Sequence, residues 1–166
     1  MILQEADLEF NFTDALSVLK FDDKAHALTH CMKAVDFVVE LPDVWLFVEV
    51  KDPSHPRAHP LAVEEFRVEA TTGELRKAII AKFRDTFLYR WAENKLDKPV
   101  HFLSLITFEE ALLSTFQDDL RKHLPFTGSE RWSRQMALSC HVINMNAWNR
   151  NFPKWPVRRL SSTRVS

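Results

Sequence analysis

The sequence predicts a mixed α/β protein in which helices flank one mixed β-sheet. Three observations support this prediction. Residues 35–41 and 44–50 are two apolar segments, close together and rich in β-branched and aromatic residues, as in paired strands. Apolar side chains recur every four residues over 74–93, as on the buried stripe of a helix. Further strand-like and helix-like segments then alternate, which is typical of helices packed on a sheet.

Length and composition are those of one globular domain. The chain has 166 residues, of which 46% are apolar and 27% charged, and a domain usually has about 100–200 residues. We expect a single domain over residues 1–166. Its core is expected over about residues 10–145, followed by a basic, aromatic C-terminal segment over about 146–166.

The sequence has neither a membrane span nor a secretory signal that we can identify. Charged residues interrupt every apolar stretch before it reaches about 18 residues, the length that a transmembrane helix needs. The first ten residues carry acids and no base, whereas a signal peptide begins with basic residues. Two cysteines, Cys31 and Cys140, are too few for a disulfide scaffold. We therefore expect a cytoplasmic protein with no membrane partner.

The N-terminal elements have the weakest pattern. Thr13 is a good helix N-cap, and the apolar residues Leu16 and Leu19 then predict a short helix within residues 3–20. A first strand is expected over residues 26–33. These two elements precede the two strongly apolar strands.

The middle of the chain is predicted as loop, helix and strand. Three prolines predict a loop over residues 52–60. The helix over 74–93 follows, with Thr72 as its expected N-cap and an apolar stripe that comprises Leu75, Ile79, Phe83 and Phe87. Residues 100–106 then predict a buried strand.

A third helix and a last strand complete the expected fold. Thr107 and Glu110 match the capping-box pattern T-x-x-E, which predicts a helix start. The apolar face of this helix comprises Leu113, Phe116, Leu120 and Leu124. Residues 136–143 predict a strand, and the aromatic remainder is expected to be irregular. The expected order is therefore helix, three strands, helix, strand, helix, strand.

The two adjacent strands bring acidic residues together. Pro42 disfavours a two-residue type I′ turn, so a four-residue loop is expected, and the paired residues then have numbers that sum to 85. Asp36 lies directly opposite Glu49 in that register, with Cβ atoms about 4.5–5.5 Å apart. Like charges at this spacing within apolar strands are destabilising. The pair therefore requires a compensating cation.

Lys51 supplies part of that positive charge, because it lies two residues after Glu49 on the same face of the strand. A hard divalent cation such as Mg²⁺ typically binds two carboxylates together with backbone or water oxygens. Such an ion can offset the charge that develops on a phosphate, and Lys51 can position or deprotonate the attacking water. A plain Glu49–Lys51 ion pair at the end of a hairpin is the alternative interpretation.

The stretch VDFVVELPDVWLFVEVKD, residues 35–52, resembles the signature of the PD-(D/E)xK (restriction-endonuclease-like) phosphodiesterase superfamily. The resemblance assigns Asp36 as the first acid, Glu49 as the second and Lys51 as the lysine. It covers roughly residues 10–108 and implies an αβββαβ core.

The resemblance also implies a cofactor and further ligands. It implies that Mg²⁺, or Mn²⁺ in its place, is held by Asp36, Glu49 and the backbone carbonyl of Val50. Val35 stands where the proline of the superfamily name is expected. Many members carry another acid on the first helix, and the candidates in this chain are Glu5, Glu9 and Asp14.

Positive charge is concentrated towards the C-terminus. Residues 1–50 hold ten acids and three bases, a net charge of −7, whereas residues 131–166 hold seven bases and no acid, a net charge of +7. The basic segment either contacts a polyanion or docks on the acidic N-terminal region of its own fold. Weak candidates for contacts with nucleic acid are Lys82, Arg84, Arg158 and Arg159; solvent-exposed helix charges are the alternative for the first two.

Other functional classes are excluded by missing motifs. Only Gly73 and Gly128 occur, whereas phosphate-binding and dinucleotide-binding loops need several glycines. The GxSxG and HExxH motifs are missing from the sequence. His55 and His59 have no cysteine partners at zinc-ligand spacing and are expected in a surface loop.

We therefore expect a metal-dependent nuclease or nuclease-related phosphodiesterase, which hydrolyses phosphodiester bonds in DNA or RNA. The alternative is a catalytically inactive module of the same fold that binds protein or nucleic acid. A weaker third hypothesis is an accessory protein whose basic tail binds nucleic acid or a partner. The resemblance implies either a homodimer or a targeting subunit.

Overall fold

The computed structural model describes residues 1–22, 32–126, 128 and 130–164. These residues form two β-sheets and four α-helices. The larger sheet has the strand order β3-β4-β5-β6-β7, and the smaller has the order β1-β2-β8. The strands are β1 (Ile2–Glu5), β2 (Leu8–Asn11), β3 (Ser17–Lys20), β4 (Phe37–Glu40), β5 (Trp45–Lys51), β6 (Val100–Ile106), β7 (Ser139–Ile143) and β8 (Val157–Arg159). The helices are α1 (Pro60–Thr72), α2 (Glu74–Ala92), α3 (Glu110–His123) and α4 (Met145–Asn151).

The larger sheet is mixed, as the sequence predicts. Strands β3, β4 and β5 are antiparallel, whereas β5, β6 and β7 are parallel. The hairpin register pairs Phe37 with Val48 and Glu40 with Trp45, so the expected sum of 85 is confirmed. Strands β5 and β6 also match the predicted segments closely, because both are mostly apolar and lie in the buried centre of the sheet.

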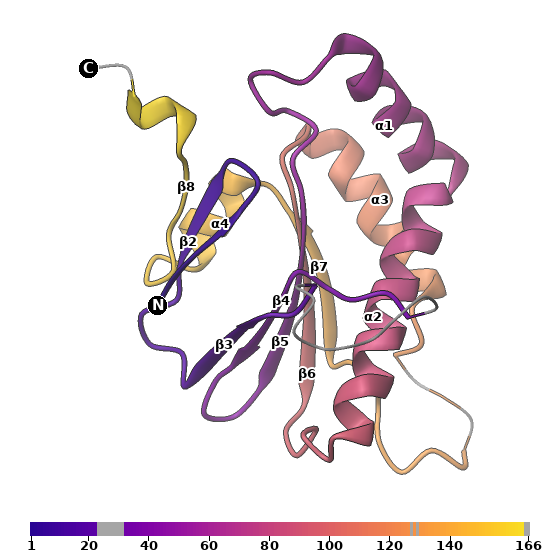
Figure 1. The fold of residues 1–166 in the computed structure, drawn as a ribbon. Helices are drawn as coiled ribbons and strands as arrows, with labels where there is room; N and C mark the ends of the chain where they lie inside the picture. Colours follow the sequence, from indigo (N-terminus) through magenta and orange to yellow (C-terminus); the bar gives the residue numbers. More distant parts are fainter. Residues whose placement is uncertain (23–31, 127, 129, 165–166) are drawn as a thin grey trace.

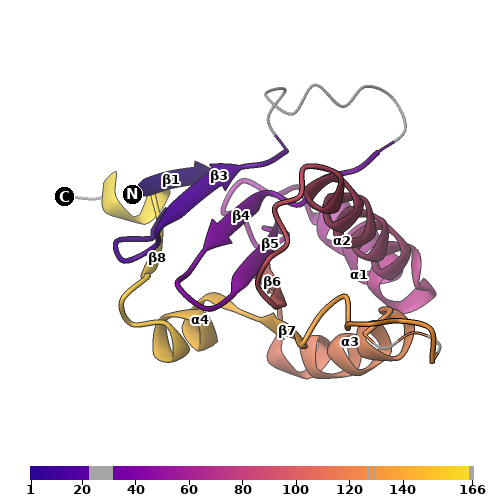
Figure 2. The same ribbon diagram turned by 90° about the horizontal axis from the view of Figure 1, so that it is seen from below.

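Two layers cover the larger sheet. Helices α1, α2 and α3 lie on one side, and the smaller sheet with α4 lies on the other (Figures 1 and 2). The side chains of the strands alternate between two cores accordingly. Phe47 and Phe102 pack against Phe83 of α2 on the helical side, whereas Phe37 packs against Phe10 of β2 on the other side.

The N-terminal prediction was wrong. Instead of a short helix, residues 3–20 contain most of β1 together with β2 and β3. Long-range backbone pairing decides this conformation, because β2 bonds to β8 and β3 bonds to β4. The strand expected over residues 26–33 falls mainly outside the described residues, and the described positions 32 and 33 belong to no strand.

Helix α1 was not predicted. Its first residue is Pro60, which suits the first turn of a helix, and the His59 side chain accepts a hydrogen bond from the Leu61 backbone N–H at 3.2 Å. Most of its surface is exposed and only Ala70 is buried, so it lacks the apolar stripe by which helices are predicted.

Two expected helix caps were also wrong. Helix α2 begins after Gly73 and not Thr72; Gly73 adopts the left-handed conformation (φ 87°) and separates α1 from α2. Helix α3 begins at Glu110 with Glu109 as its N-cap. The Thr107 hydroxyl bonds to the Asp52 carboxylate instead of capping α3.

The C-terminal segment is more regular than expected. Residues 136–138 precede β7, which covers only Ser139–Ile143. Helix α4, strand β8 and a 3₁₀ helix (Ser161–Arg164) then follow where an irregular segment was expected. Among the described residues, no helix combines the length and the apolar character that crossing a membrane requires.

Candidate functional site

The predicted acids meet at the carboxyl end of β5, on the side of the larger sheet that faces α2. Glu49 and Lys51 alternate with Val48 and Val50 along β5, so they share a face with Phe47, which packs on α2. Asp36 directly precedes β4 and approaches the same place. Crevices at the carboxyl ends of parallel strands are common ligand sites in α/β proteins.

Backbone contacts fix the position of Asp36. Its Oδ2 atom accepts a hydrogen bond from the Val50 backbone N–H at 2.5 Å, and its carbonyl oxygen accepts one from the Phe21 N–H at 2.7 Å. The preceding residue, Val35, donates its backbone N–H to the hydroxyl of Thr86 on α2 at 3.0 Å. Asp36 is 3% exposed, so its carboxylate lies in a rigid, largely dry position.

Glu49 is completely buried. Its Oε1 atom lies 2.9 Å from Lys51 Nζ and 2.8 Å from Lys82 Nζ, whereas the buried Oε2 atom has no hydrogen-bond partner among the described residues. Burial, and then the charge of Asp36, raise the pKa of Glu49 to about 7, although Lys51 and Lys82 partly oppose this shift. An unpaired buried carboxylate oxygen is costly.

Lys82 of α2 lies between the two acids. Its Nζ atom is 3.2 Å from Asp36 Oδ1 and 2.8 Å from Glu49 Oε1. Burial opposes the charge of Lys82, but the charges of Glu49 and Asp36 prevail and raise its pKa above the ordinary value. Lys82 is a weak candidate for contact with nucleic acid from the sequence; in the structure it is a counter-ion of both carboxylates.

A second group of acids adjoins Asp36. One carboxylate oxygen each from Glu5, Asp22 and Asp36 lies within 4.8 Å of the others. Burial and the charges of Asp36 and Glu5 raise the pKa of Asp22. Of the three N-terminal candidates, Glu5 alone joins Asp36 in this group, and it also pairs with Lys20 at 2.9 Å. Glu9 pairs with Arg158 and Asp14 with Lys154.

Asp22 and Ser104 were not found from the sequence. Asp22 follows β3, and the pairing of β3 with β4 brings it to Asp36; the incorrect helix prediction concealed this relation. Ser104 is the register partner of Glu49 on β6, and its buried hydroxyl has no hydrogen-bond partner in the described part of the chain. The available signal for Ser104 is its position as a polar residue between Leu103 and Leu105 of a strand-like segment.

Three predicted cationic contacts lie in ion pairs within the chain. Arg84 pairs with its neighbour Asp85 at 2.9 Å. Arg158 pairs with Glu9 at 2.6 Å, and Arg159 pairs with Asp52 at 2.7 Å. These last two pairs support the interpretation that the basic C-terminal segment docks on the acidic N-terminal half.

The loop histidines and Cys140 make no contact with Asp36 or Glu49 among the interactions of the described residues. His55 Nε2 lies 3.7 Å from Asp7 Oδ2, and His59 caps α1. Cys140 is buried, and burial raises the pKa of its thiol to about 12, which disfavours the reactive thiolate. Cys31 lies outside the described residues.

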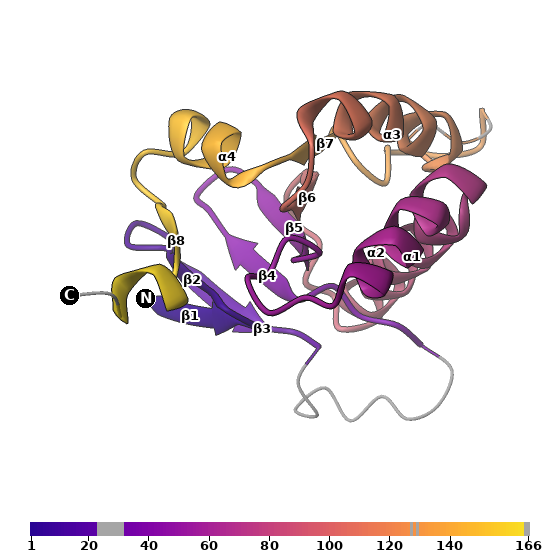
Figure 3. The same ribbon diagram turned by 90° about the horizontal axis from the view of Figure 1, so that it is seen from above.

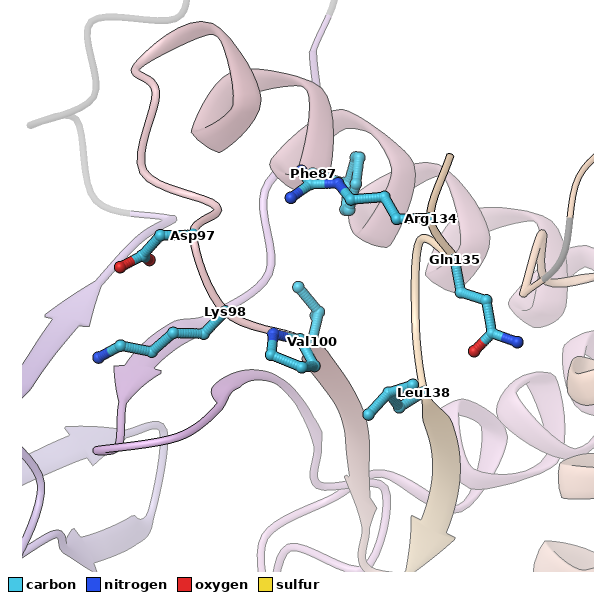
Figure 4. Close-up of a pocket in the computed structure, with 8 residues that line it drawn as sticks. Phe87, Asp97, Lys98, Val100, Arg134, Gln135 and Leu138 are labelled. Atoms are coloured by element: carbon cyan, nitrogen blue, oxygen red, sulfur yellow. The ribbon is translucent and has the colours of Figure 1, made fainter. Parts of the chain in front are cut away.

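A cavity of about 260 Å³ lies at the other end of β6, where Val100 pairs with Trp45 (Figure 4). Two cations line it, but Lys98 pairs with Glu40 at 2.8 Å and the Arg134 guanidinium stacks over Phe87 at 5.7 Å. None of the four acids described above lines this cavity.

Comparison with known proteins adds no assignment: no protein-family model, curated protein or solved structure matches this chain. The site is therefore described by its own chemistry. It combines two buried, closely held carboxylates with two lysines, and further carboxylates lie beside them. Such an arrangement can hold a hard cation and present positive charge to an anionic substrate.

Proposed function

We propose that this protein is a metal-dependent nuclease or nuclease-related phosphodiesterase, which hydrolyses phosphodiester bonds in DNA or RNA. The observation that carries the proposal is the gathering of Asp36, Glu49 and Lys51 at one end of β5. A buried acid pair of this kind is costly, and such arrangements are concentrated at functional sites.

The donor set fits Mg²⁺ or Mn²⁺. All the candidate ligand atoms are oxygens, which these hard cations prefer. The buried Glu49 Oε2 atom has no described hydrogen-bond partner, so a cation would satisfy it. Asp36 and Glu49 would hold the ion, with the Val50 carbonyl as the third ligand implied by the resemblance; Glu5 and Asp22 offer further oxygens beside Asp36. Once bound, the ion would offset negative charge that develops on the phosphate.

The lysines have complementary tasks in this proposal. Lys51 is one-third exposed, so its ammonium group can contact both Glu49 and a phosphate or water that approaches from solvent. Lys82 is more buried and holds the two carboxylates together in the cation-free protein. We assign Lys51 to orienting the attacking water and neutralising charge on the phosphate.

Calorimetry with Mg²⁺ and Mn²⁺ tests the proposal, followed by a cleavage screen on DNA and RNA. The variant Asp36→Asn with Glu49→Gln should lose metal binding, and Lys51→Ala should lose cleavage while it still binds the metal. A matched control is Glu65→Gln with Glu69→Gln, since these two acids lie on the exposed surface of α1. Metal binding that survives in the first variant, or cleavage that survives in Lys51→Ala, would contradict the assigned roles.

Lys82 favours a second candidate function, a catalytically inactive module that binds protein or nucleic acid. Its ammonium group lies between Asp36 and Glu49 and supplies a positive charge without a metal ion. In that case the folded wild-type protein binds neither Mg²⁺ nor Mn²⁺ and cleaves no nucleic acid.

The variant Lys82→Met separates the two candidates. If the protein is an enzyme, Lys82 and the metal ion compete for the same two carboxylates. Removing the positive charge of Lys82 should then strengthen Mg²⁺ binding about tenfold, a change of about 1.4 kcal/mol in binding free energy. Arg84→Met, two residues further along α2 and paired with Asp85, is the control. If Lys82→Met binds Mg²⁺ and the wild-type protein does not, the lysine has replaced the metal and the inactive module is favoured.

A further inference from the structure

The C-terminal strand β8 reaches the candidate site through one side chain. Strand β8 is the third strand of the smaller sheet, and Arg159 pairs with Leu8 of β2 in its register. Figures 1 and 3 show this sheet beside the larger one, on the side away from α1 and α2. The Arg159 side chain crosses from the smaller sheet to Asp52, the residue directly after Lys51.

The contact between Arg159 and Asp52 is bidentate. Arg159 Nη1 donates to Asp52 Oδ2 and Nη2 donates to Oδ1, both at 2.7 Å. The side chains are 15% and 6% exposed, respectively. Two parallel charge-assisted hydrogen bonds fix orientation as well as distance, and solvent screens a largely buried pair only weakly. Arg159 therefore holds Asp52 in one orientation.

Asp52 is also tied to the end of β6. The Thr107 hydroxyl donates to Asp52 Oδ1 at 2.5 Å, and the Thr107 backbone N–H donates to the Lys51 carbonyl at 3.0 Å. The Ser54 N–H donates to the same Thr107 hydroxyl at 3.2 Å. The chain that leaves β5 is consequently held at Lys51 and over the residues that directly follow it.

Arg159 is itself anchored on the smaller sheet. Its Nη1 atom also lies 3.3 Å from Asp7 Oδ2, in the turn between β1 and β2. Asp7 accepts hydrogen bonds from the backbone N–H and the hydroxyl of Ser161, at 3.1 and 2.5 Å. The same hairpin carries Glu5, which adjoins Asp36. The smaller sheet thus contacts the candidate site at two points.

We propose that Arg159 and Asp52 are positioning residues for Lys51, and that β8 is a structural part of the candidate site. Lysine has a long, flexible side chain, so the direction of Lys51 depends on how firmly its backbone is held. Without the Arg159 bridge, residues 52–54 relax and the ammonium group of Lys51 leaves its position beside Glu49. The expected effect on catalysis rests on the proposed function, whereas the expected effect on the position of the Lys51 ammonium group does not.

The decisive comparison is Arg159→Met against Lys154→Met, which removes one positive charge from the same segment but from a side chain that is 80% exposed. Nuclear magnetic resonance of the Lys51 side chain, assigned by the loss of its signals in Lys51→Arg, reports the orientation without requiring activity. We expect the Lys51 signals to shift and broaden in Arg159→Met and to remain unchanged in Lys154→Met.

Cleavage supplies the second measurement. We expect Arg159→Met to lower kcat about 10- to 100-fold with little change in KM, which is the effect of misplacing a group near the reacting atoms. Arg159→Lys keeps the charge but loses the bidentate geometry and should be intermediate. If Arg159→Met does not fold, Arg159→Lys and Asp52→Asn carry the comparison.

Unchanged Lys51 signals in these folded variants would overturn the inference. Loss of cleavage to the same extent in Lys154→Met would overturn it as well, because it would indicate an unspecific effect of charge. If the wild-type protein cleaves no nucleic acid while the Lys51 signals respond to Arg159→Met, then the proposed function fails and the positioning role stands.

Discussion

Glu49 is an acidic residue in a fully buried environment. Its carboxyl group is completely buried beside Asp36, and its pKa of about 7 means that it is half protonated near neutral pH. Two lysines reduce the cost of its charge without removing it. A side chain in this state responds both to pH and to any cation that reaches it.

This state predicts a pH dependence of stability in metal-free buffer. The pKa of Glu49 lies above its ordinary value of 4.5, so its contribution is fully present below about pH 4.5 and is lost as the pH rises through about 7. The shift corresponds to about 3 kcal/mol. Glu49→Gln should therefore be more stable than wild type at pH 8 and not at pH 4.5, as measured by urea unfolding with EDTA present.

Glu40→Gln is the control for that experiment. Hydrogen bonds from Lys98 and Ser17 lower the pKa of Glu40, so its charged form is the stabilising one. The substitution should lower stability at pH 8, opposite in sign to Glu49→Gln. Equal stability of Glu49→Gln and wild type at pH 8 would show that the lysines compensate the buried charge completely.

At the scale of the elements, the hydrophobic pattern predicted the strands and helices whose formation is determined by local sequence. Strands β5 and β6 and helix α2 follow apolar segments whose period and length are visible in the sequence. Helix α1 was missed because its buried face is small. The ends of helices were predicted least well, since Thr72 and Thr107 match capping patterns but neither caps a helix.

Gly73 offers a test of the junction between α1 and α2. Its φ of 87° is unfavourable for a residue with a side chain, so Gly73→Ala should lower the free energy of unfolding by about 1–2 kcal/mol. Thr72→Ala should change it by less than about 0.5 kcal/mol, whereas loss of a true N-cap costs about 1 kcal/mol. Chemical denaturation of both variants provides the measurement, and the reverse order would restore Thr72 as the cap.

At the scale of the whole molecule, the hairpin site was predictable and its surroundings were not. Asp36, Glu49 and Lys51 meet because of a local register that the sequence specifies. Glu5 and Asp22 join them only because β3 pairs with β4 and the β1–β2 hairpin packs nearby. No local pattern reveals pairing between β2 and β8, which lie almost the whole chain apart.

That long-range pairing predicts the effect of removing β8. A chain that ends at Pro156 loses the buried residue Val157 and the edge strand that bonds to β2. We expect its Tm to fall by about 3–12 °C, since burial of one valine contributes about 1.5–3 kcal/mol and 1 kcal/mol shifts Tm by about 2–4 °C at this size. A chain that ends at Ser162 keeps β8 and is the control; circular dichroism on heating distinguishes them. An unchanged Tm for the shorter chain would mean that β8 is dispensable.

The pairing of β2 with β8 also bears on the order of events during synthesis. The β1–β2 hairpin precedes every other element, whereas β8 follows the larger sheet and all four helices. The ribosome releases the N-terminal segments first, and contacts between distant segments form slowly. The hairpin can pack Phe10 on Phe37 of β4 before that, but the outer edge of β2 stays unpaired until β8 is released. A nascent chain would thus assemble its scaffold first and bring Arg159 to Asp52 at the end, so that the proposed nuclease becomes competent only after its scaffold has formed.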